Sequence, residues 1–166
     1  LLVLARPDAA ITSYHPGEES LRVEDALRAA PALIGKAPDF IHLGLGNADL
    51  LAGIDPAAAL EALRGLVQLL TLKTQAAVSV ATVVSSFLPP EARPAAEVFN
   101  AGLPALAGDR VRITDLDLPV RAFLDVHRRA GGEKRALHAR PLRLTSMGRA
   151  FLARTAFVRS GLEELA

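Results

Sequence analysis

The chain has 166 residues, of which 51% are hydrophobic and 22% charged, a composition typical of a globular protein with room for one domain core. Its net charge of +1 excludes a uniformly basic nucleic-acid binder, and the absence of cysteine excludes disulfides, thiolate metal sites and cysteine nucleophiles. Six Phe and one Tyr are too few for a base-stacking platform, and no apolar run is long enough to predict a membrane span.

The first predicted elements are a short strand and a helix. Residues 9–12 are β-prone and end at the turn signal Pro16-Gly17. Residues 20–34 carry apolar side chains at helical spacing, and Pro31 is expected to kink or split that helix.

The next pair of elements has clearer boundaries. Residues 40–45 predict a strand that ends in the glycine turn Gly46-Asn47. Asp55 is a helix N-cap and Pro56 suits the first helical position, so a helix is predicted from here to about Leu72.

The second half continues the alternation of strands and helices. Strands are predicted over residues 76–84 and 111–114, and helices over residues 94–106, near 120–126, and from Ser146 to about Leu162. Alternating strands and helices favour a parallel sheet with helices on both faces. The sequence therefore predicts an α/β fold: one three-layer α/β/α domain spanning residues 1–166.

Charge is distributed unevenly along the chain. Residues 1–60 hold 4 Lys and Arg against 8 Asp and Glu, whereas residues 61–166 hold 15 against 10. Residues 126–160 contain nine basic residues and Glu133 alone. Such a run is typical of a solvated face, and the alternative is an anion-binding module.

Two segments carry a family resemblance. Pro38–Leu50 reads PDFIHLGLGNADL, and Leu142–Arg149 reads LRLTSMGR. They resemble the SGNH (GDSL-like) hydrolases, in which a strand delivers an oxyanion-hole Asn and a closing segment precedes the last helix. Ile11–Gly17 is similar to the family's second strand and its glycine turn, and Glu97–Leu106 to its penultimate helix region. The resemblance implies an α/β/α hydrolase fold over nearly the whole chain.

The chain departs from that family at the catalytic positions. The family uses a Ser at the end of the first strand, with a His three residues after an Asp. The Gly-Asp-Ser-Leu segment is absent, and Arg140 and Arg143 stand at the Asp and His positions. Ala48 stands at the oxyanion Asn position, with Asn47 one residue earlier. The remaining cleft residues implied by the resemblance are Gly17, Gly46, Asn47 and Asp49.

The family's first strand also has no counterpart. It lies centrally in the sheet, so its omission leaves unpaired edges, which proteins avoid. The gap is expected to be filled by Leu1–Leu4, by a protein partner or second copy that completes the sheet, or by closure of the sheet. The chain opens without Met, so a processed or truncated chain is expected.

Other residue pairs offer weak alternatives for a site. Ser13 and His15 lie two apart on a strand and so share a face, which makes them the remaining catalytic candidates. His42 is expected to be buried and neutral in mid-strand. The other two histidines are not catalytic candidates. The side chains of His127 and Asp125 point in different directions if this stretch is helical, and His138 lies among arginines.

No cofactor or metal site is predicted. The four histidines have no acidic partners at ligand spacing, and Gly44-Leu45-Gly46 is an incomplete dinucleotide fingerprint in which Asp49 replaces the third glycine. Asp49 is expected to cap or brace the turn.

Three functions follow from these observations. The first is a non-catalytic member of the SGNH-like fold that binds a small ligand or a protein partner. The second is an ester hydrolase whose nucleophile lies upstream or on another chain. The third is an anion-binding module in the Arg-rich C-terminal third, with no specific nucleic-acid binding expected.

Overall fold

The computed structural model describes residues 21–129, 138–140 and 143–144. The predicted strand over residues 9–12, the Pro16-Gly17 turn and the helix predicted from Ser146 lie outside the described residues. So do the candidates Ser13 and His15.

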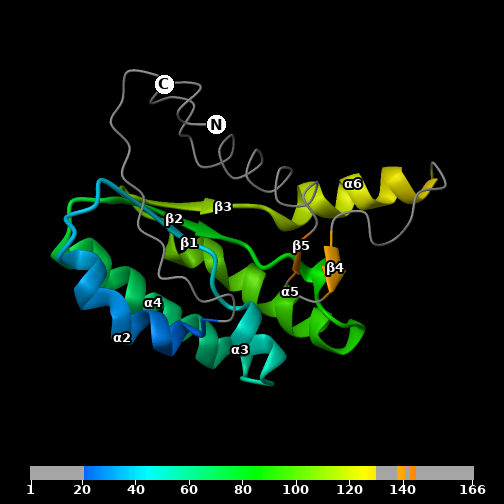
Figure 1. Ribbon diagram of the computed structural model, residues 1–166, viewed down its shortest axis with the longest axis horizontal. Helices are drawn as coiled ribbons and strands as arrows, with labels where there is room; N and C mark the ends of the chain where they lie inside the picture. Colours follow the sequence, from blue (N-terminus) through cyan, green and yellow to red (C-terminus); the bar gives the residue numbers. More distant parts are fainter. Residues whose placement is uncertain (1–20, 130–137, 141–142, 145–166) are drawn as a thin grey trace, which may run out of the picture.

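The centre of the fold is a parallel sheet of three strands (Figure 1). The strands are β1 (Phe40–Leu43), β2 (Ala77–Ala81) and β3 (Val111–Thr114), in the order β1-β2-β3. All three point the same way, with Phe40 opposite Ala77 and Val78 opposite Val111. The predicted strand over 111–114 is confirmed, while the other two are shorter than predicted.

Helices connect the strands and flank the sheet. The α-helices are α2 (Val23–Ile34), α3 (Asn47–Leu51), α4 (Pro56–Lys73), α5 (Arg93–Gly102) and α6 (Asp117–Arg129). Three short 3₁₀ helices, η1 (Ser85–Phe87), η2 (Pro90–Ala92) and η3 (Leu103–Leu106), lie between β2 and β3. A two-stranded antiparallel hairpin follows α6, formed by β4 (His138–Arg140) and β5 (Arg143–Leu144).

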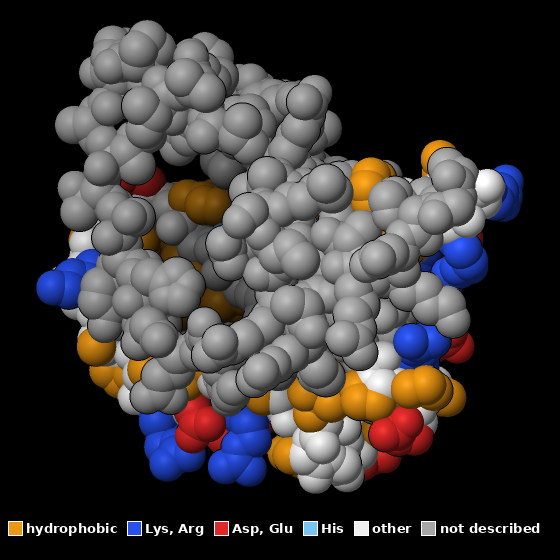
Figure 2. Space-filling model, turned by 45° about the vertical axis from the view of Figure 1, so that its right-hand side comes forward, with side chains coloured by type: hydrophobic (Ala, Val, Ile, Leu, Met, Phe, Trp, Pro, Cys, Tyr) orange, Lys and Arg blue, Asp and Glu red, His pale blue; other side chains and the backbone are white. Residues whose placement is uncertain are grey.

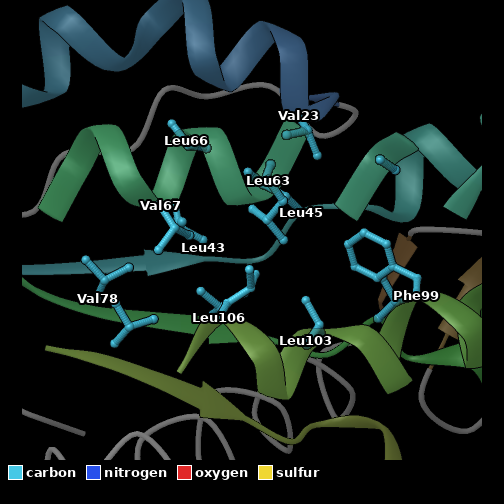
Figure 3. Close-up of a cluster of buried hydrophobic side chains, with 14 of the residues drawn as sticks. Val23, Leu43, Leu45, Leu63, Leu66, Val67, Val78, Phe99, Leu103 and Leu106 are labelled. Carbon is cyan, nitrogen blue, oxygen red and sulfur yellow. The ribbon is translucent and has the colours of Figure 1, made fainter. Parts of the chain in front are cut away.

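The main core lies between one face of the sheet and the helices α2, α4 and α5 (Figure 3). Helix α4 packs against both α2 and α5. Strand alternation directs every second side chain into this core. Its buried members from the strands and helices include Val23, Ile41, Leu43, Leu63, Leu66, Leu70, Val78, Val80, Phe99, Leu103 and Val111.

The opposite face of the sheet carries a second, smaller cluster. Ala81 of β2 packs with Val84, Phe87, Leu116 and Val120, which brings α6 against this side. Helices therefore lie on both faces of a parallel sheet, and the predicted α/β/α architecture with three layers is confirmed.

Local sequence signals account for the longest helix. The Asp55 carboxylate accepts hydrogen bonds from the backbone N–H groups of Ala57 and Ala58, both at 3.0 Å, as predicted for its N-cap role. At the other end, the Arg110 guanidinium donates to the backbone carbonyls of Thr71 and Thr74. A cation at this end of a helix also complements the helix dipole.

Three features differ from the sequence-based expectations. Pro31 does not split α2, which continues through it to Ile34. Helix α3 begins directly after Gly46, where only a turn was predicted. Helix α6 is longer than predicted, since Asp117 starts it three residues before Val120.

Large exposed hydrophobic side chains are spread over α2, α3, α4, α5 and α6. In Figure 2, hydrophobic side chains on the displayed face alternate with charged ones. Within the part of the chain that the structure describes, no helix is long and apolar enough to cross a membrane.

Candidate functional site

The carboxyl ends of the three parallel strands define one edge of the sheet, here called the rim. It is formed by the segments that follow β1, β2 and β3, beginning at Gly44, Thr82 and Asp115. Ligand clefts of open α/β sheets lie at this edge. Two predicted site residues, Gly46 and Asn47, lie here.

Close packing fixes the Gly46-Asn47 turn. Gly46 has a φ of 105°, a conformation that favours glycine. A Cβ atom at this position would lie 2.8 Å from the Phe99 ring and 3.1 Å from the Val83 side chain. Only glycine allows the turn to approach α5 this closely, and contacts with Phe99 and Val83 hold the turn in place.

Asn100 holds the segment that follows β2 through hydrogen bonds. Its side-chain amide donates to the Val83 carbonyl and accepts from the Val83 N–H, both at 2.8 Å. Adjacent residues of α5, Phe99 and Asn100, therefore support the turns after β1 and β2. The sequence predicted a helix here but not the role of Asn100, because Asn100 and Val83 are 17 residues apart.

Asn47 begins α3 and its side chain is half-buried. Among the described residues, its amide makes no hydrogen bond. Asparagine side chains carry two donor hydrogens and one acceptor oxygen. Asn47 thus offers hydrogen-bonding capacity at the rim that the described part of the chain does not use.

Asp49 lies two residues further along α3 and is buried, with 2% of its surface exposed. Its carboxylate oxygens accept from the Val23 N–H at 3.2 and 3.3 Å, which ties α3 to the start of α2. Burial raises the pKa of Asp49 above its ordinary value, while the Val23 hydrogen bond acts in the opposite direction. In these contacts Asp49 braces the turn, and it lies away from solvent.

A polar network joins the ends of β2 and β3. The Asp117 carboxylate accepts from both the N–H and the hydroxyl of Ser85 at 2.8 Å, and Arg121 lies 3.3 Å from its other oxygen. The Thr82 hydroxyl accepts from the Leu116 and Asp117 N–H groups at 2.8 and 3.0 Å. These groups satisfy one another and fix the start of α6.

A histidine and a serine meet in the middle of the sheet. His42 Nδ1 lies 3.0 Å from Ser79 Oγ, which in turn lies 2.6 Å from Thr114 Oγ1. Ser79 is 1% exposed, so it cannot reach a substrate. His42 is not buried as expected, because it occupies the strand face opposite the main core. Desolvation by the surrounding protein nevertheless lowers its pKa, which favours the neutral ring.

The hairpin contains Arg140 and Arg143, the two residues that the family resemblance aligns with its acid and base positions. Its register places Arg140 of β4 directly opposite Arg143 of β5. Figures 1 and 3 both show the hairpin beside α5, on the side toward which the parallel strands point. The chain thus brings both positions to the rim.

For the other sequence candidates the structure gives no place in this site. Ser13, His15 and Gly17 lie outside the described residues. Asp125 is exposed on α6 and pairs with Arg128 at 3.0 Å. The described residues contain no cluster of three His, Asp or Glu side chains that could hold a metal ion.

Comparison with known proteins supports the architecture. No family model matches the chain, and no curated protein matches it. Among solved structures, the crystal structure of TesA is similar, with a TM-score of 0.63 and 20% sequence identity over 86% of this chain and 73% of that one. The chain therefore shares its α/β/α fold with that structure.

Proposed function

We propose that this chain is a non-catalytic domain of the SGNH-hydrolase-like fold that binds a ligand at its rim. The observation that carries the proposal is the pairing of Arg140 with Arg143 in the hairpin. The family resemblance expects an Asp and a His at these two positions. A guanidinium remains protonated at neutral pH and cannot act as a general base.

The described polar pairs offer no replacement for the missing base. His42 contacts a serine, but that serine is buried in mid-sheet. Ser85 contacts a carboxylate, but Asp117 is held by Arg121 and by the Ser85 N–H, and no histidine joins this network within residues 21–129. Nucleophilic activation of serine needs a base that is itself oriented by a third group.

What remains of the site suits binding. The Gly46-Asn47 turn is rigidly supported by Phe99 and Val83. Preorganised polar groups at the end of a strand bind a ligand with little loss of conformational entropy. The Asn47 amide provides one such group.

An ester hydrolase is the second candidate, and the likeness in fold to TesA favours it. In this alternative the nucleophile comes from residues 1–20, with Ser13 as the candidate, or from another chain. It still requires a general base in place of Arg143.

Hydrolysis of short-chain p-nitrophenyl esters separates the two functions. We expect a rate no higher than that of buffer containing an inactive protein, because loss of triad members costs several orders of magnitude in turnover. A turnover of about 1 per second that Ser13→Ala abolishes would contradict the proposal and establish the hydrolase.

A further inference from the structure

We propose that His42, Ser79 and Thr114 form a pH-sensitive link across the sheet, which is intact while His42 is neutral and is weakened when His42 takes up a proton. The link is a chain of side-chain hydrogen bonds. His42 Nδ1 lies 3.0 Å from Ser79 Oγ, and Ser79 Oγ lies 2.6 Å from Thr114 Oγ1. Each residue comes from a different strand, β1, β2 and β3 in that order. This inference is independent of the proposed binding function.

The direction of these hydrogen bonds follows from the hydrogen atoms available. A hydroxyl donates one hydrogen, whereas one nitrogen of a neutral imidazole donates and the other accepts. Among the described residues, Thr114 Oγ1 makes no hydrogen bond besides that with Ser79 Oγ. The Thr114 hydroxyl is therefore satisfied as a donor only if it donates to Ser79, and Ser79 then donates to His42 Nδ1. The hydrogen of the neutral His42 ring is consequently on Nε2.

Burial makes this direction matter. Ser79 is 1% exposed and Thr114 is 0% exposed. A buried hydroxyl hydrogen without an acceptor has lost its hydrogen bond to water without replacement, which costs free energy. The His42 side chain is exposed, so a proton from solvent can reach its ring. The chain of hydrogen bonds thus joins a ring that solvent can protonate to two hydroxyls that solvent does not reach.

Protonation of His42 upsets the chain. Both nitrogens of an imidazolium ring are donors, so Nδ1 now donates to Ser79 Oγ. If Ser79 turns to donate to Thr114, the Thr114 hydrogen has no acceptor among the described residues. If Thr114 keeps donating to Ser79, the Ser79 hydrogen has none. Either arrangement disfavours the protonated ring, in the same direction as the desolvation that lowers the pKa of His42.

Charges on the same face of the sheet do not favour protonation. Among the described residues, the β2 side chains on this face are alanines and Ser79, which carry no charge. Arg112 of β3 lies in register with Ser79, two strand spacings or about 10 Å from β1, and a positive charge there opposes a second one. Asp115 and Asp117 follow β3 and are engaged at the start of α6.

Imidazole NMR on the full chain tests the inference. At neutral pH we expect His42 to carry its hydrogen on Nε2 and not on Nδ1. Titration of the same signals then gives the pKa of His42 in each variant. Ser79→Ala removes the hydroxyl that donates to Nδ1, so the pKa of His42 should rise toward its ordinary value of 6.5.

Ser85→Ala is the matched control, because it removes a buried hydroxyl that donates to Asp117 instead. It should leave the pKa of His42 unchanged. Thermal unfolding of both variants checks that each still folds.

Urea denaturation gives a second measurement that does not depend on the folding of Ser79→Ala. His42→Asn keeps an acceptor oxygen for Ser79 and does not titrate. Because the pKa of His42 is lower in the folded chain than in the unfolded one, the stability of the wild type relative to this variant should be constant above pH 6.5. It should then fall as the pH decreases through the folded pKa.

Three results would overturn the inference. The first is a neutral His42 ring with its hydrogen on Nδ1, which would reverse the chain. The second is a pKa of His42 that Ser79→Ala leaves unchanged or that Ser85→Ala raises equally, since desolvation alone would then set it. The third is a relative stability of the wild type that does not fall in acid.

Discussion

The two ends of the rim are built differently. At the ends of β2 and β3, Asp117 accepts two hydrogen bonds from Ser85 and faces Arg121. At the end of β1, the equally buried Asp49 accepts from the Val23 N–H at 3.2–3.3 Å. Asn47 beside it has no hydrogen-bond partner among the described residues.

The polar groups at the β2–β3 end hold the fold together, whereas the Asn47 amide at the β1 end is the group that we propose to bind a ligand. Buried polar groups in folded proteins are normally satisfied. At the β2–β3 end Thr82, Ser85 and Asp117 satisfy one another, whereas the neighbouring Ser86 hydroxyl is buried without a hydrogen-bond partner among the described residues. The β1 end combines a tightly packed turn with the half-buried Asn47 amide, which has no hydrogen-bond partner among the described residues. Such a combination of rigid support and unsatisfied polarity is typical of a binding site. The comparison can be tested by perturbing each end separately.

The largest effect is expected at Gly46. Gly46→Ala places a methyl group 2.8 Å from the Phe99 ring in a backbone conformation that favours glycine, so it should destabilise the fold by about 3 kcal/mol. Urea denaturation measures the change. Gly44→Ala is the control, because its Cβ would meet nothing within 4 Å, and it should stay within about 0.5 kcal/mol of the wild type. Equal losses would show that the turn is not specially constrained.

A smaller loss is expected at the β2–β3 end. Asp117→Ala removes the oxygen that accepts both Ser85 hydrogen bonds, together with the partner of Arg121, and should cost about 2 kcal/mol in the free energy of unfolding. The exposed pair Asp125–Arg128 is the control. Asp125→Ala should cost less than about 0.5 kcal/mol in the same denaturation experiment. Similar costs for the two variants would show that the network contributes nothing beyond surface pairing.

The smallest effect concerns the pH dependence contributed by Asp49. Its folded-state pKa is raised above the ordinary value of 3.8, so the folded chain holds this proton more tightly than the unfolded chain. The stability from that proton is complete below the unfolded pKa and is lost as pH rises through the folded pKa.

Asp49→Asn keeps an oxygen acceptor for Val23 and does not titrate. Its stability relative to the wild type should therefore increase as pH rises from about 4, then level off above the folded pKa. Unfolding curves at a series of pH values measure this difference. A relative stability that falls with pH would mean that Asp49 is stabilised as the carboxylate.

Local signals in the sequence determined much of the scaffold. Asp55 and Pro56 specified the start of α4 because capping depends on residues within one turn. The apolar β-branched run around Val78 and Val80 indicated a buried central strand, and its alternation with helices indicated a parallel sheet. The family resemblance predicted the SGNH-like architecture, with which the likeness to TesA agrees.

The rim was decided by contacts between segments distant in sequence. Gly46 and Phe99 are 53 positions apart, and Asp49 and Val23 are 26 positions apart, so no local sequence pattern predicted either contact. His42 was expected to be buried from its apolar neighbours, yet its side chain is exposed. Strand β1 lies at the edge of the described sheet, whereas Ser79 and Thr114 of β2 and β3 are buried on the same face. Arg140 and Arg143 are three apart in sequence, but the hairpin alone made them direct neighbours, because pairing register depends on backbone hydrogen bonds and not on composition.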